Sequence, residues 1–600
     1  MRLRSLVLGY FGVALATLAT FGVSARAYAP GNPVVVSDRE AALDAYGSAQ
    51  PPNTGTDPIQ PNTQIEPSIA VNPGDYNNVF TDFQVGRVDG GGDADNGYGT
   101  SLDGGLTWTW GNLPGLTKAA PSPQPSGVIC PANATNTPYD RASDAVAAFG
   151  KDPRTTGQAH GGYYAYAQSL VFDDSTCSGL PSGMALNVSS DGGVTWSPAV
   201  QLEGDAGAGL NDKNWIVSDN ATGVGHHPGR TYIVWDRVAT VEIAYCDPDS
   251  PLSLAPGNGP GCDKLYNWAT FSGKLFQPIS AVQGIGSFPV VLNNGSLGIL
   301  YNTLAASCGV PNECNQNNAG VGGNVWTLIP GAGATPFGSP LPAPTVYTTV
   351  ASYQGGTVQF QRAGTLPQVA HDPVTDDLVA VWEDNRFRTD SGGNQNDAVF
   401  SASTNMGVTW STPARINQGP TGDFVNHYNT TIAVGADGIW RAAYRQRNES
   451  PGFTIRTPGI DSYYQESRDQ GATWSAPLKI NTGSPVSDPQ FGAYSRFTTG
   501  GGLFQGDYEQ IAAGGNDESY FTRDESFAPP GGPSTCNNDF VDPPSPCQNQ
   551  TTWVSHLLPQ SQADVPDSRI VPALVLVGGV TGMAVLQVRA RRRRHRSTTA

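Results

Sequence analysis

The chain has 600 residues, of which 14% are charged, and its formal net charge is -18 at pH 7. Its 73 glycines and 48 prolines indicate many short strands joined by turns, yet their share stays below that of unstructured low-complexity chains. The acidic balance argues against a nucleic-acid partner, which would need a basic face. The length excludes one simple β-sandwich, so a larger all-β body is expected.

The first 27 residues have the pattern of a secretory signal peptide. Arginines at positions 2 and 4 precede an apolar run over 5–23, and small residues around Ala27 offer an A-x-A cleavage site. A second site ending at Ala29 is less favoured because Pro30 follows it directly. The pattern predicts export, with an uncleaved anchor as the alternative, and a linker is expected over 28–60.

A repeat of the form Ser-x-Asp-x-Gly-x-Thr-Trp marks the next segment, 61–557. Its four near-copies span 101–108, 189–196, 403–410 and 467–474. The aspartate, replaced once by asparagine, is expected to accept hydrogen bonds within the turn, and the tryptophan is expected to anchor the turn on a neighbouring layer. These residues are Asp103 with Trp108, Asp191 with Trp196, Asn405 with Trp410, and Asp469 with Trp474.

The repeat resembles the Asp-box, or BNR repeat, of the sialidase-like β-propellers. The resemblance implies an all-β propeller of four-stranded antiparallel blades, with each box in the hairpin that joins the two outer strands. It also implies that the boxes lie on the face away from the ligand site. Their aspartates are therefore expected to be structural rather than catalytic.

A second repeat, an alternating strand followed by a turn and another strand, recurs seven times. The copies begin at Glu66, Asp140, Asp212, Ser287, Leu366, Tyr428 and Asp507. The wide interval between Asp191 and Asn405 leaves room for two blades without a box. Seven blades are favoured and six stay open, because known sialidase domains have six. The strand at 552–557 would close the ring.

On this frame the starts of the first strands and the ends of the second strands share one face around the axis, which is the candidate ligand face. It collects Glu66, Asp140, Arg141, Asp212, Lys213, Asp236, Arg237, Asp423, His427, Tyr428, Asp507, Tyr508, Arg523 and Asp524.

The resemblance also implies a site chemistry: three arginines that grip a sugar carboxylate, a tyrosine nucleophile with an acidic partner, and an aspartate acid/base. The arginine candidates are Arg386, Arg388, Arg445 and Arg447. Tyr463 or Tyr464 with Glu466, or Tyr508 with Glu509, could supply the tyrosine pair. A two-carboxylate glycosidase is the variant reading, in which Glu383 and Asp384 compete with Asp236, Asp507 and Glu509. The alternative for each residue is an ion pair without catalytic duty.

One position departs from the sialidase pattern. Sialidases typically open their first blade with Arg-Ile-Pro or Arg-Leu-Pro, whereas this chain has Gln64-Ile65-Glu66-Pro67 there. A carboxylate at Glu66 would repel sialic acid. We therefore expect a noncatalytic propeller that binds extracellular glycan or protein, with an exo-acting glycoside hydrolase as the alternative and a structural surface-layer protein as a third possibility.

The eight cysteines of an exported chain predict disulfides. Spacing favours the pairs Cys246–Cys262, Cys308–Cys314 and Cys536–Cys547, which leaves Cys130 with Cys177, although spacing alone does not fix the pairing. No two cysteines have the C-x-x-C spacing that is typical of zinc sites, so a zinc site is not expected. The acidic loop 89–97 offers oxygen ligands for calcium, but its irregular spacing favours a flexible loop, and no cofactor is required.

The C-terminal end predicts a membrane anchor. A stalk over 558–569 leads to a nearly apolar segment over 570–588, long enough for one membrane helix. The arginine-rich tail at 589–600 would lie in the cytoplasm by the positive-inside rule, which places the body at the cell surface. The residues Val565-Pro566-Asp567-Ser568 resemble the start of a bacterial sorting signal, so later cleavage by a sorting enzyme stays open.

Overall fold

The computed structural model describes residues 28–30, 34–36, 59–88, 90–117, 139–152, 159–172, 182–204, 211–237, 240–249, 260–264, 267–269, 284–303, 321–347, 350–353, 366–389, 395–450, 459–481, 487–495, 503–515, 517–528 and 548–559. The chain divides into two compact units, 1–559 and 560–600, and all described residues lie in unit 1. The predicted signal peptide and the predicted membrane helix over 570–588 lie outside them. No helix within the described ranges is long and apolar enough to cross a membrane.

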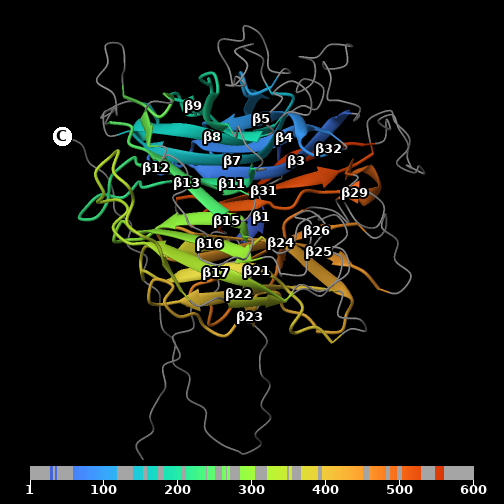
Figure 1. Ribbon diagram of the computed structural model, residues 1–600. Coiled ribbons are helices and arrows are strands. Elements are labelled where there is room, and N and C mark those ends of the chain that lie inside the picture. Colours follow the sequence, from blue (N-terminus) through green and yellow to red (C-terminus); the bar gives the residue numbers. More distant parts are fainter. Residues whose placement is uncertain are drawn as a thin grey trace, which may run out of the picture. The chain divides into compact units, whose positions relative to one another are not determined.

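Unit 1 is built from strands, with short 3-10 turns at Ala159–Gly162 and Pro489–Phe491 (Figure 1). Apart from one small hairpin, the strands in the described part of the chain fall into seven consecutive antiparallel groups, numbered here in chain order. Group 1 holds β3 (Ile59–Val71), β4 (Val79–Val88), β5 (Asp93–Ser101) and β6 (Thr109–Asn112). Group 2 holds β7 (Arg141–Lys151), β8 (Tyr163–Phe172), β9 (Ser182–Ser189) and β10 (Val200–Gly204). Group 3 holds β11 (Asn211–Ser218), β12 (Thr231–Arg237), β13 (Thr240–Cys246) and β14 (Trp268–Ala269).

The remaining groups repeat this plan. Group 4 holds β15 (Gly284–Val291), β16 (Leu297–Thr303), β17 (Val321–Ile329) and β18 (Thr345–Val346), and β19 (Val350–Tyr353) also pairs with β17. Group 5 holds β20 (Gln368–His371), β21 (Leu378–Asp384), β22 (Asp397–Ser403) and β23 (Ala414–Arg415). Group 6 holds β24 (Val425–Val434), β25 (Trp440–Asn448), β26 (Asp461–Ser467) and β27 (Leu478–Lys479). Group 7 holds β30 (Gln510–Ala513), β31 (Ser519–Ser526) and β32 (Gln550–Pro559). Between groups 6 and 7 lies the small hairpin of β28 (Ala493–Tyr494) and β29 (Leu503–Phe504).

Group 7 is completed from the other end of the chain. The strands β1 (Tyr28–Pro30) and β2 (Val34–Val35) pair antiparallel with β32, with Tyr28 opposite Pro559 and Val34 opposite Val554. Part of the segment expected to be a linker is therefore strand, and β32 runs two residues into the expected stalk. The physical reason is that β32 would otherwise present an unpaired edge.

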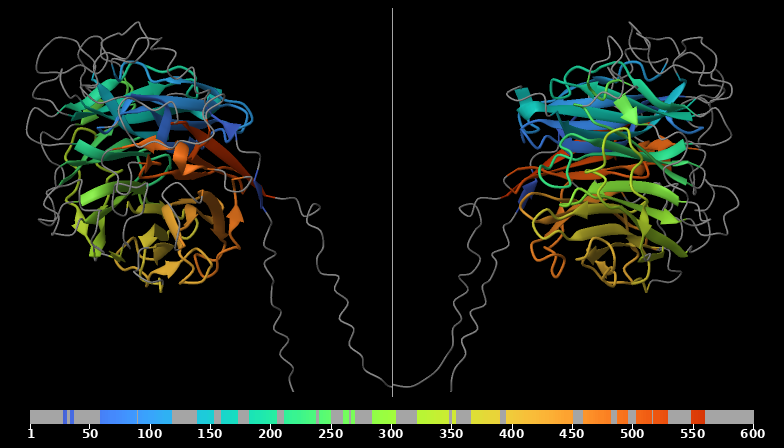
Figure 2. Two further views of the ribbon diagram at one scale, coloured as in Figure 1. Left: turned by 90° about the vertical axis from the view of Figure 1, so that its right-hand side faces the viewer. Right: turned by 60° about the vertical axis from the view of Figure 1, so that its left-hand side comes forward.

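The first strands of the groups form a ring of contacts. β3 contacts β7, and the contacts continue through β11, β15, β20, β24 and β30 back to β3. Figure 2 shows the groups following one another around unit 1, from blue through green and yellow to orange and red. The first strands of these groups thus meet around the centre of unit 1.

The four boxes have the geometry that their sequence predicts. Each joins the third and fourth strands of its group, and Asp103 accepts hydrogen bonds from Thr107 N at 2.8 Å and Thr107 Oγ1 at 2.6 Å. The boxes at 189–196 and 467–474 repeat these bonds. In the third box Asn405 Oδ1 accepts from Thr409 N, and Asn405 Nδ2 donates to Thr409 Oγ1, both at 2.9 Å.

Each box tryptophan packs on the preceding group. Trp196 of group 2 lies 4.9 Å from Phe80 of group 1, and Trp474 of group 6 lies 5.4 Å from Phe400 of group 5, measured between ring centroids. Trp410 lies 5.9 Å from Trp326 of group 4, and Trp108 packs in the cluster that contains Tyr520 of group 7. The predicted role as an anchor between layers is confirmed.

One predicted disulfide falls within the described residues. Cys246 at the end of β13 is bonded to Cys262, with a Cα–Cα distance of 5.9 Å. The other six cysteines, at 130, 177, 308, 314, 536 and 547, lie outside the described ranges.

Candidate functional site

The first strands share a backbone irregularity at one level of the ring. β3, β7, β11, β15 and β24 each carry a one-residue register shift against their second strand. The residues at these bulges with positive φ are Glu66 (53°), Asp144 (44°), Lys213 (26°), Gly286 (77°) and Asn429 (50°). In group 7, Gly506 (93°) precedes β30. Positive φ at a non-glycine residue costs on the order of 1–3 kcal/mol and is commonly retained at functional sites.

Three buried acids hold this ring together from group to group. Asp236 Oδ2 accepts from Gly286 N at 2.6 Å, so that group 3 is bonded to the bulge of group 4. Glu383 Oε1 accepts from Thr430 N at 3.3 Å, and Asp524 Oδ2 accepts from Glu66 N at 3.3 Å. Burial raises the pKa of Glu383 to about 7. Glu383 and Asp236, which the sequence offers as catalytic carboxylates, are thus bonded to the backbone of the next group.

At the centre of unit 1 lies a group of side chains that we call the axial cluster. It consists of Glu66, Asp82, Asp144, Lys213, Trp215, Phe288 and Tyr508, which come from groups 7, 1, 2, 3 and 4. Trp215 lies 4.4 Å from Phe288 and 5.7 Å from Tyr508 between ring centroids. Lys213 Nζ lies 3.3 Å from the Tyr508 ring centroid and 4.6 Å from that of Trp215. The ammonium therefore faces an aromatic floor.

Acidic side chains surround that ammonium. Burial lowers the pKa of Lys213, while the charges of Asp144, Glu66, Asp236 and Asp212 oppose this effect. No described residue hydrogen-bonds Lys213 Nζ.

The Glu66 side chain fastens the cluster across groups. Its Oε1 accepts from Asp507 N at 2.9 Å, and its Oε2 accepts from the amide of Gln84. The Tyr508 hydroxyl donates to Ala145 O at 3.4 Å. Burial, and then the charge of Glu66, raises the pKa of Tyr508 well above its usual range. Tyr508 therefore remains neutral in the folded protein.

The arginines after β21 are bonded to carboxylates of the protein. Arg386 binds Asp384 with two hydrogen bonds, Nε to Oδ1 at 2.8 Å and Nη2 to Oδ2 at 2.7 Å. Arg388 contacts Asp397 at 3.2 Å and Asp423 at 2.8 Å, and its side chain is fully buried. Both guanidinium groups are thus paired with protein carboxylates, which a substrate carboxylate would have to displace.

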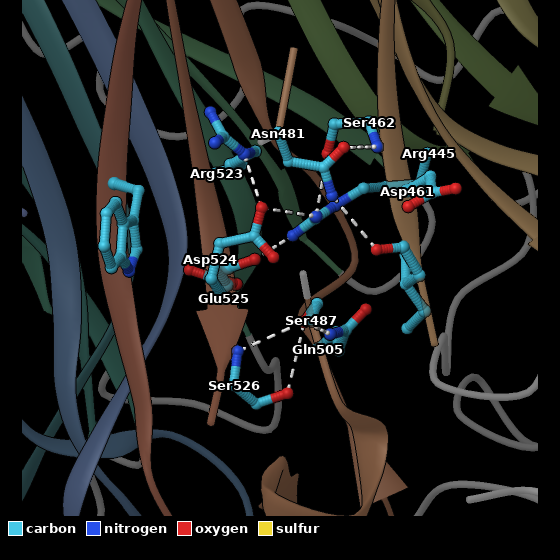
Figure 3. A network of polar contacts seen from close by, with 12 residues as sticks. Arg445, Asp461, Ser462, Asn481, Ser487, Gln505, Arg523, Asp524, Glu525 and Ser526 are labelled. Atoms are coloured by element: carbon cyan, nitrogen blue, oxygen red, sulfur yellow. Dashed lines mark hydrogen bonds and ion pairs between the residues drawn. The ribbon is translucent and has the colours of Figure 1, made fainter. Parts of the chain in front are cut away.

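The arginines of β25 lie in a buried network between groups 6 and 7. Arg445 Nε donates to Glu509 Oε1 at 2.8 Å, and Nη1 lies 3.3 Å from Glu525 Oε1. Arg523 Nε donates to the same Glu525 oxygen at 2.6 Å. Figure 3 shows Arg445 and Arg523 meeting the acidic residues of β31 from opposite sides.

Arg447 belongs to a second buried pair beside this network. Its Nη1 lies 3.9 Å from Glu449 Oε1, and burial raises the pKa of Glu449 to about 7. All four arginines named as carboxylate-binding candidates therefore contact a carboxylate of the protein.

The predicted tyrosine pair is together, but in the core. Tyr464 Oη donates to Glu466 Oε2 at 3.3 Å, and Glu466 also accepts from Arg468 Nε at 2.8 Å. Tyr464 is 1% exposed and packs with Ile480, Ile511 and other apolar residues between groups 6 and 7. Glu466 precedes the box at 467–474, on the side away from the first-strand starts.

The other ligand-face candidates are dispersed. Arg141 is buried and donates to Gly91 O at 2.9 Å, next to the buried Asp140. Arg237 pairs with Glu242 at 3.4 Å. Tyr428 is buried and donates to Gln505 Oε1 at 3.4 Å. Asp212 is exposed and Asp507 half-buried.

The acidic loop does not assemble ion ligands in the described structure. Asp93 pairs with Arg87 at 3.2 Å, and Asp95 accepts from Asn112 at 3.2 Å. Among the described residues no three His, Cys, Asp or Glu side chains are placed to hold a metal ion.

Sequence reasoning missed Asp82, Asp144 and Trp215 as site residues. A signal was present: aligning the strand repeats places a polar residue two or three positions before a buried apolar one, as in Glu66 to Ile69 and Lys213 to Trp215. The positive φ of these polar residues, in contrast, cannot be recognised from the sequence.

Comparisons with known proteins give only distant likenesses. No family model and no curated protein matches the chain. Among solved structures, a protein of unknown function from Dyadobacter fermentans aligns with TM-score 0.39 and 11% identity, over 89% of this chain and 99% of that one. The Hadza microbial sialidase Hz136 gives TM-score 0.35 and 12% identity, over 77% and 63%. The α-L-arabinofuranosidase of Fusarium graminearum with arabinobiose gives 0.36 and 12%, over 88% and 97%. Likenesses this low assign neither a family nor an activity.

Proposed function

We propose that groups 1 to 7 are the blades of a seven-bladed propeller that binds a glycan or glycoprotein outside the cell, without catalysis of the sialidase type. The closed ring of first strands and the completion of group 7 by β1 and β2 support the blade number. The axial cluster is the proposed binding site, because it joins an aromatic floor to polar groups at the centre of the ring.

The proposed absence of sialidase chemistry rests on one observation, the pairing of the four candidate arginines with carboxylates of the protein. Each of Arg386, Arg388, Arg445 and Arg447 contacts a carboxylate of the protein. Breaking a buried pair of this kind leaves an uncompensated charge and costs about 3–5 kcal/mol. A substrate carboxylate would have to displace such a partner before it could be held.

The test uses the full chain with a fluorogenic sialoside and a glycan array. We expect no turnover of the sialoside and saturable binding to glycans on the array. Turnover that Arg386→Ala or Tyr464→Phe abolishes would overturn the noncatalytic reading. An array without any bound glycan would overturn glycan binding and direct attention to protein partners.

An exo-acting glycoside hydrolase, of the sialidase or two-carboxylate type, is the second candidate. The contact of Tyr464 with Glu466 favours the first type, and the pKa of Glu383 near 7, suited to a general acid, favours the second. A screen of neutral and acidic fluorogenic glycosides distinguishes them, since only the second type is inactivated by Glu383→Gln.

The proposal places unit 1 at the cell surface. Support comes from the signal-like pattern over 1–27 and from the apolar segment 570–588 with its basic tail. The test is protease treatment of intact cells that produce the full chain, with antibodies to unit 1 and to the tail. Loss of the unit 1 signal with an intact tail signal is expected, and protection of both would contradict the placement.

A further inference from the structure

Exposed apolar side chains gather at one end of unit 1, which we call the box face. It consists of the four box hairpins and the turns that join the first strand of each group to the second. Seven large apolar residues of the described ranges are exposed, and six of them lie in these hairpins and turns. They are Tyr76, Leu102, Leu106, Val224, Val374 and Val408. Single exposed apolar residues are ordinary, but confinement of those in the described structure to one face calls for a common cause.

Hydrogen bonds join the turns and hairpins of the box face to one another. Asn78 Nδ2, in the turn after β3, donates to Gly192 O of the second box at 2.8 Å. His226 Nε2, in the turn after β11, donates to Asn293 O in the turn after β15 at 2.7 Å. Asn293 Nδ2 in turn donates to Pro373 O, in the turn after β20, at 3.2 Å. The exposed apolar residues therefore stand on one continuous surface that crosses several groups.

Both ends of unit 1 lie at the box face. β32 ends at Pro559, which pairs with Tyr28 at the start of β1. Leu557, two residues earlier, pairs with Ser519, which directly follows the turn between β30 and β31. Leu558 is the seventh exposed apolar residue, and it lies where the chain leaves this face.

The length of chain beyond β32 restricts which face can reach a membrane. Ten residues, 560–569, separate β32 from the apolar segment 570–588, and an extended chain of that length reaches at most about 35 Å. β32 itself has 10 residues and spans about 33 Å from the opposite face to the box face. A chain that leaves at the box face would need nearly this whole reach to return to the opposite face. With segment 570–588 in a membrane, the box face is therefore the one that is held near the lipid.

The side chains of the box face restrict the kind of lipid. Tyr76 is 44% exposed, and tyrosine is enriched at the boundary between membrane and water. Asp103 and Asp469 are exposed on the same face, and carboxylates of this kind are negative at neutral pH. Anionic headgroups would be repelled by these aspartates, whereas zwitterionic headgroups carry no net charge.

We propose that the box face rests on the outer lipid surface of the membrane that holds segment 570–588, with its exposed apolar side chains among zwitterionic headgroups. This rests on the proposed placement of unit 1 at the cell surface. The opposite face, where the first strands begin, then points away from the membrane and toward an extracellular ligand.

The experiment compares the two ends of β21 in the full chain, reconstituted into phosphatidylcholine vesicles. Val374→Cys lies on the box face before the strand, and Thr389→Cys replaces an exposed residue beyond its other end. Each introduced thiol carries a fluorophore, and part of the lipid carries a spin label on its headgroup as quencher. The unsubstituted chain, labelled in parallel, gives the background from its own cysteines. We expect quenching at position 374 to be at least threefold stronger than at position 389.

Further variants test the apolar side chains themselves. Leu106→Ser combined with Val224→Ser, in the chain labelled at position 374, should weaken quenching at least twofold. Both residues are exposed, by 75% and 99%, so the fold should tolerate the change. The matched control Asn448→Ser changes an exposed residue at the opposite end of a group and should leave quenching unchanged. Vesicles of phosphatidylglycerol should also weaken quenching, because their headgroups repel the box aspartates.

The outcomes separate this proposal from the placement on which it rests. A chain that does not float with the vesicles in a density gradient would overturn both. A chain that floats but shows equal quenching at positions 374 and 389 would overturn the docking alone. Protection of position 374 from a water-soluble thiol reagent, without quenching, would show that a protein covers the face and would overturn the lipid as its partner. Stronger quenching in phosphatidylglycerol would overturn the lipid class.

Discussion

The box hairpins and the ring of bulges repeat around the same unit but are maintained in opposite ways. In each box the aspartate or asparagine side chain finds its partner within five residues, so that Asp103 bonds Thr107 and Asp469 bonds Thr473. The bulges carry different residues, and some of them are bonded to a neighbouring group, as Glu66 is to Asp507 and Gly286 is to Asp236. The local hydrogen bonds of the boxes require the same motif in each copy. The contacts at the centre differ from group to group, so the bulge residues can differ as well. The side chains thus differ from group to group at the centre and not in the boxes.

The largest effect on stability is expected from removing an arginine that contacts carboxylates of another group. Arg445→Met should lower the free energy of unfolding by about 3–5 kcal/mol, because it leaves Glu509 buried without its cation and removes one of the two arginines that contact Glu525. Urea unfolding followed by circular dichroism measures it. Arg415→Met, at a half-buried arginine near Asp397, is the control and should cost far less. Equal effects of the two substitutions would contradict a central role for the network.

The pH dependence of stability tests the role of Glu383, the carboxyl group that bonds group 5 to group 6. The folded pKa of Glu383 is about 7 against an ordinary 4.5, so the folded state binds the proton more tightly. Its contribution to stability is therefore present below pH 4.5 and is lost as the pH rises to about 7, by on the order of 3 kcal/mol. His427, whose pKa burial lowers to about 4, acts in the opposite direction between pH 4 and 6.5.

The contribution of Glu383 is isolated by comparing wild type with Glu383→Gln in urea unfolding from pH 4.5 to 7.5. The fall in stability with rising pH should be smaller in the variant. Parallel pH profiles would show that Glu383 does not titrate in this range.

The hydrogen bond from group 4 to group 3 gives an intermediate effect. Asp236→Ala leaves Gly286 N without its acceptor and should destabilise the fold by about 1–3 kcal/mol. Asp236→Asn keeps an acceptor oxygen and should cost less. Differential scanning calorimetry of both variants checks the order, and a larger loss with asparagine would indicate that the negative charge, rather than the acceptor, matters.

The smallest effect is expected in the boxes. Thr107→Val removes one exposed hydrogen bond to Asp103 and should cost about 0.5–1.5 kcal/mol. Asn405→Asp restores the common form of the motif and should leave stability within about 0.5 kcal/mol. Thermal unfolding measures both. A loss at Thr107 as large as that at Arg445 would remove the distinction between local and central contacts.

The sequence could predict what is local. The box turns depend on residues close in the chain and could be predicted from the repeat, and spacing favoured the Cys246–Cys262 pair without fixing it. The partners of the tryptophan anchors, such as Phe80 for Trp196, lie far along the chain and could not be named. The strands at 28–35 were missed because their partner β32 lies at the far end of unit 1. The arginine partners were missed for the same reason, since Arg445 meets Glu509 and Glu525 from another group. The axial cluster requires five groups to be in place before its members meet.

The pairing of Tyr28 with Pro559 also sets a limit on how unit 1 can fold. Group 7 needs its first and last strands at once, so the sheet cannot be completed until the final strand has left the ribosome. Contacts between residues so distant in sequence slow folding. The ring of this unit therefore cannot close until β32 has been synthesised, so that closure comes late in folding.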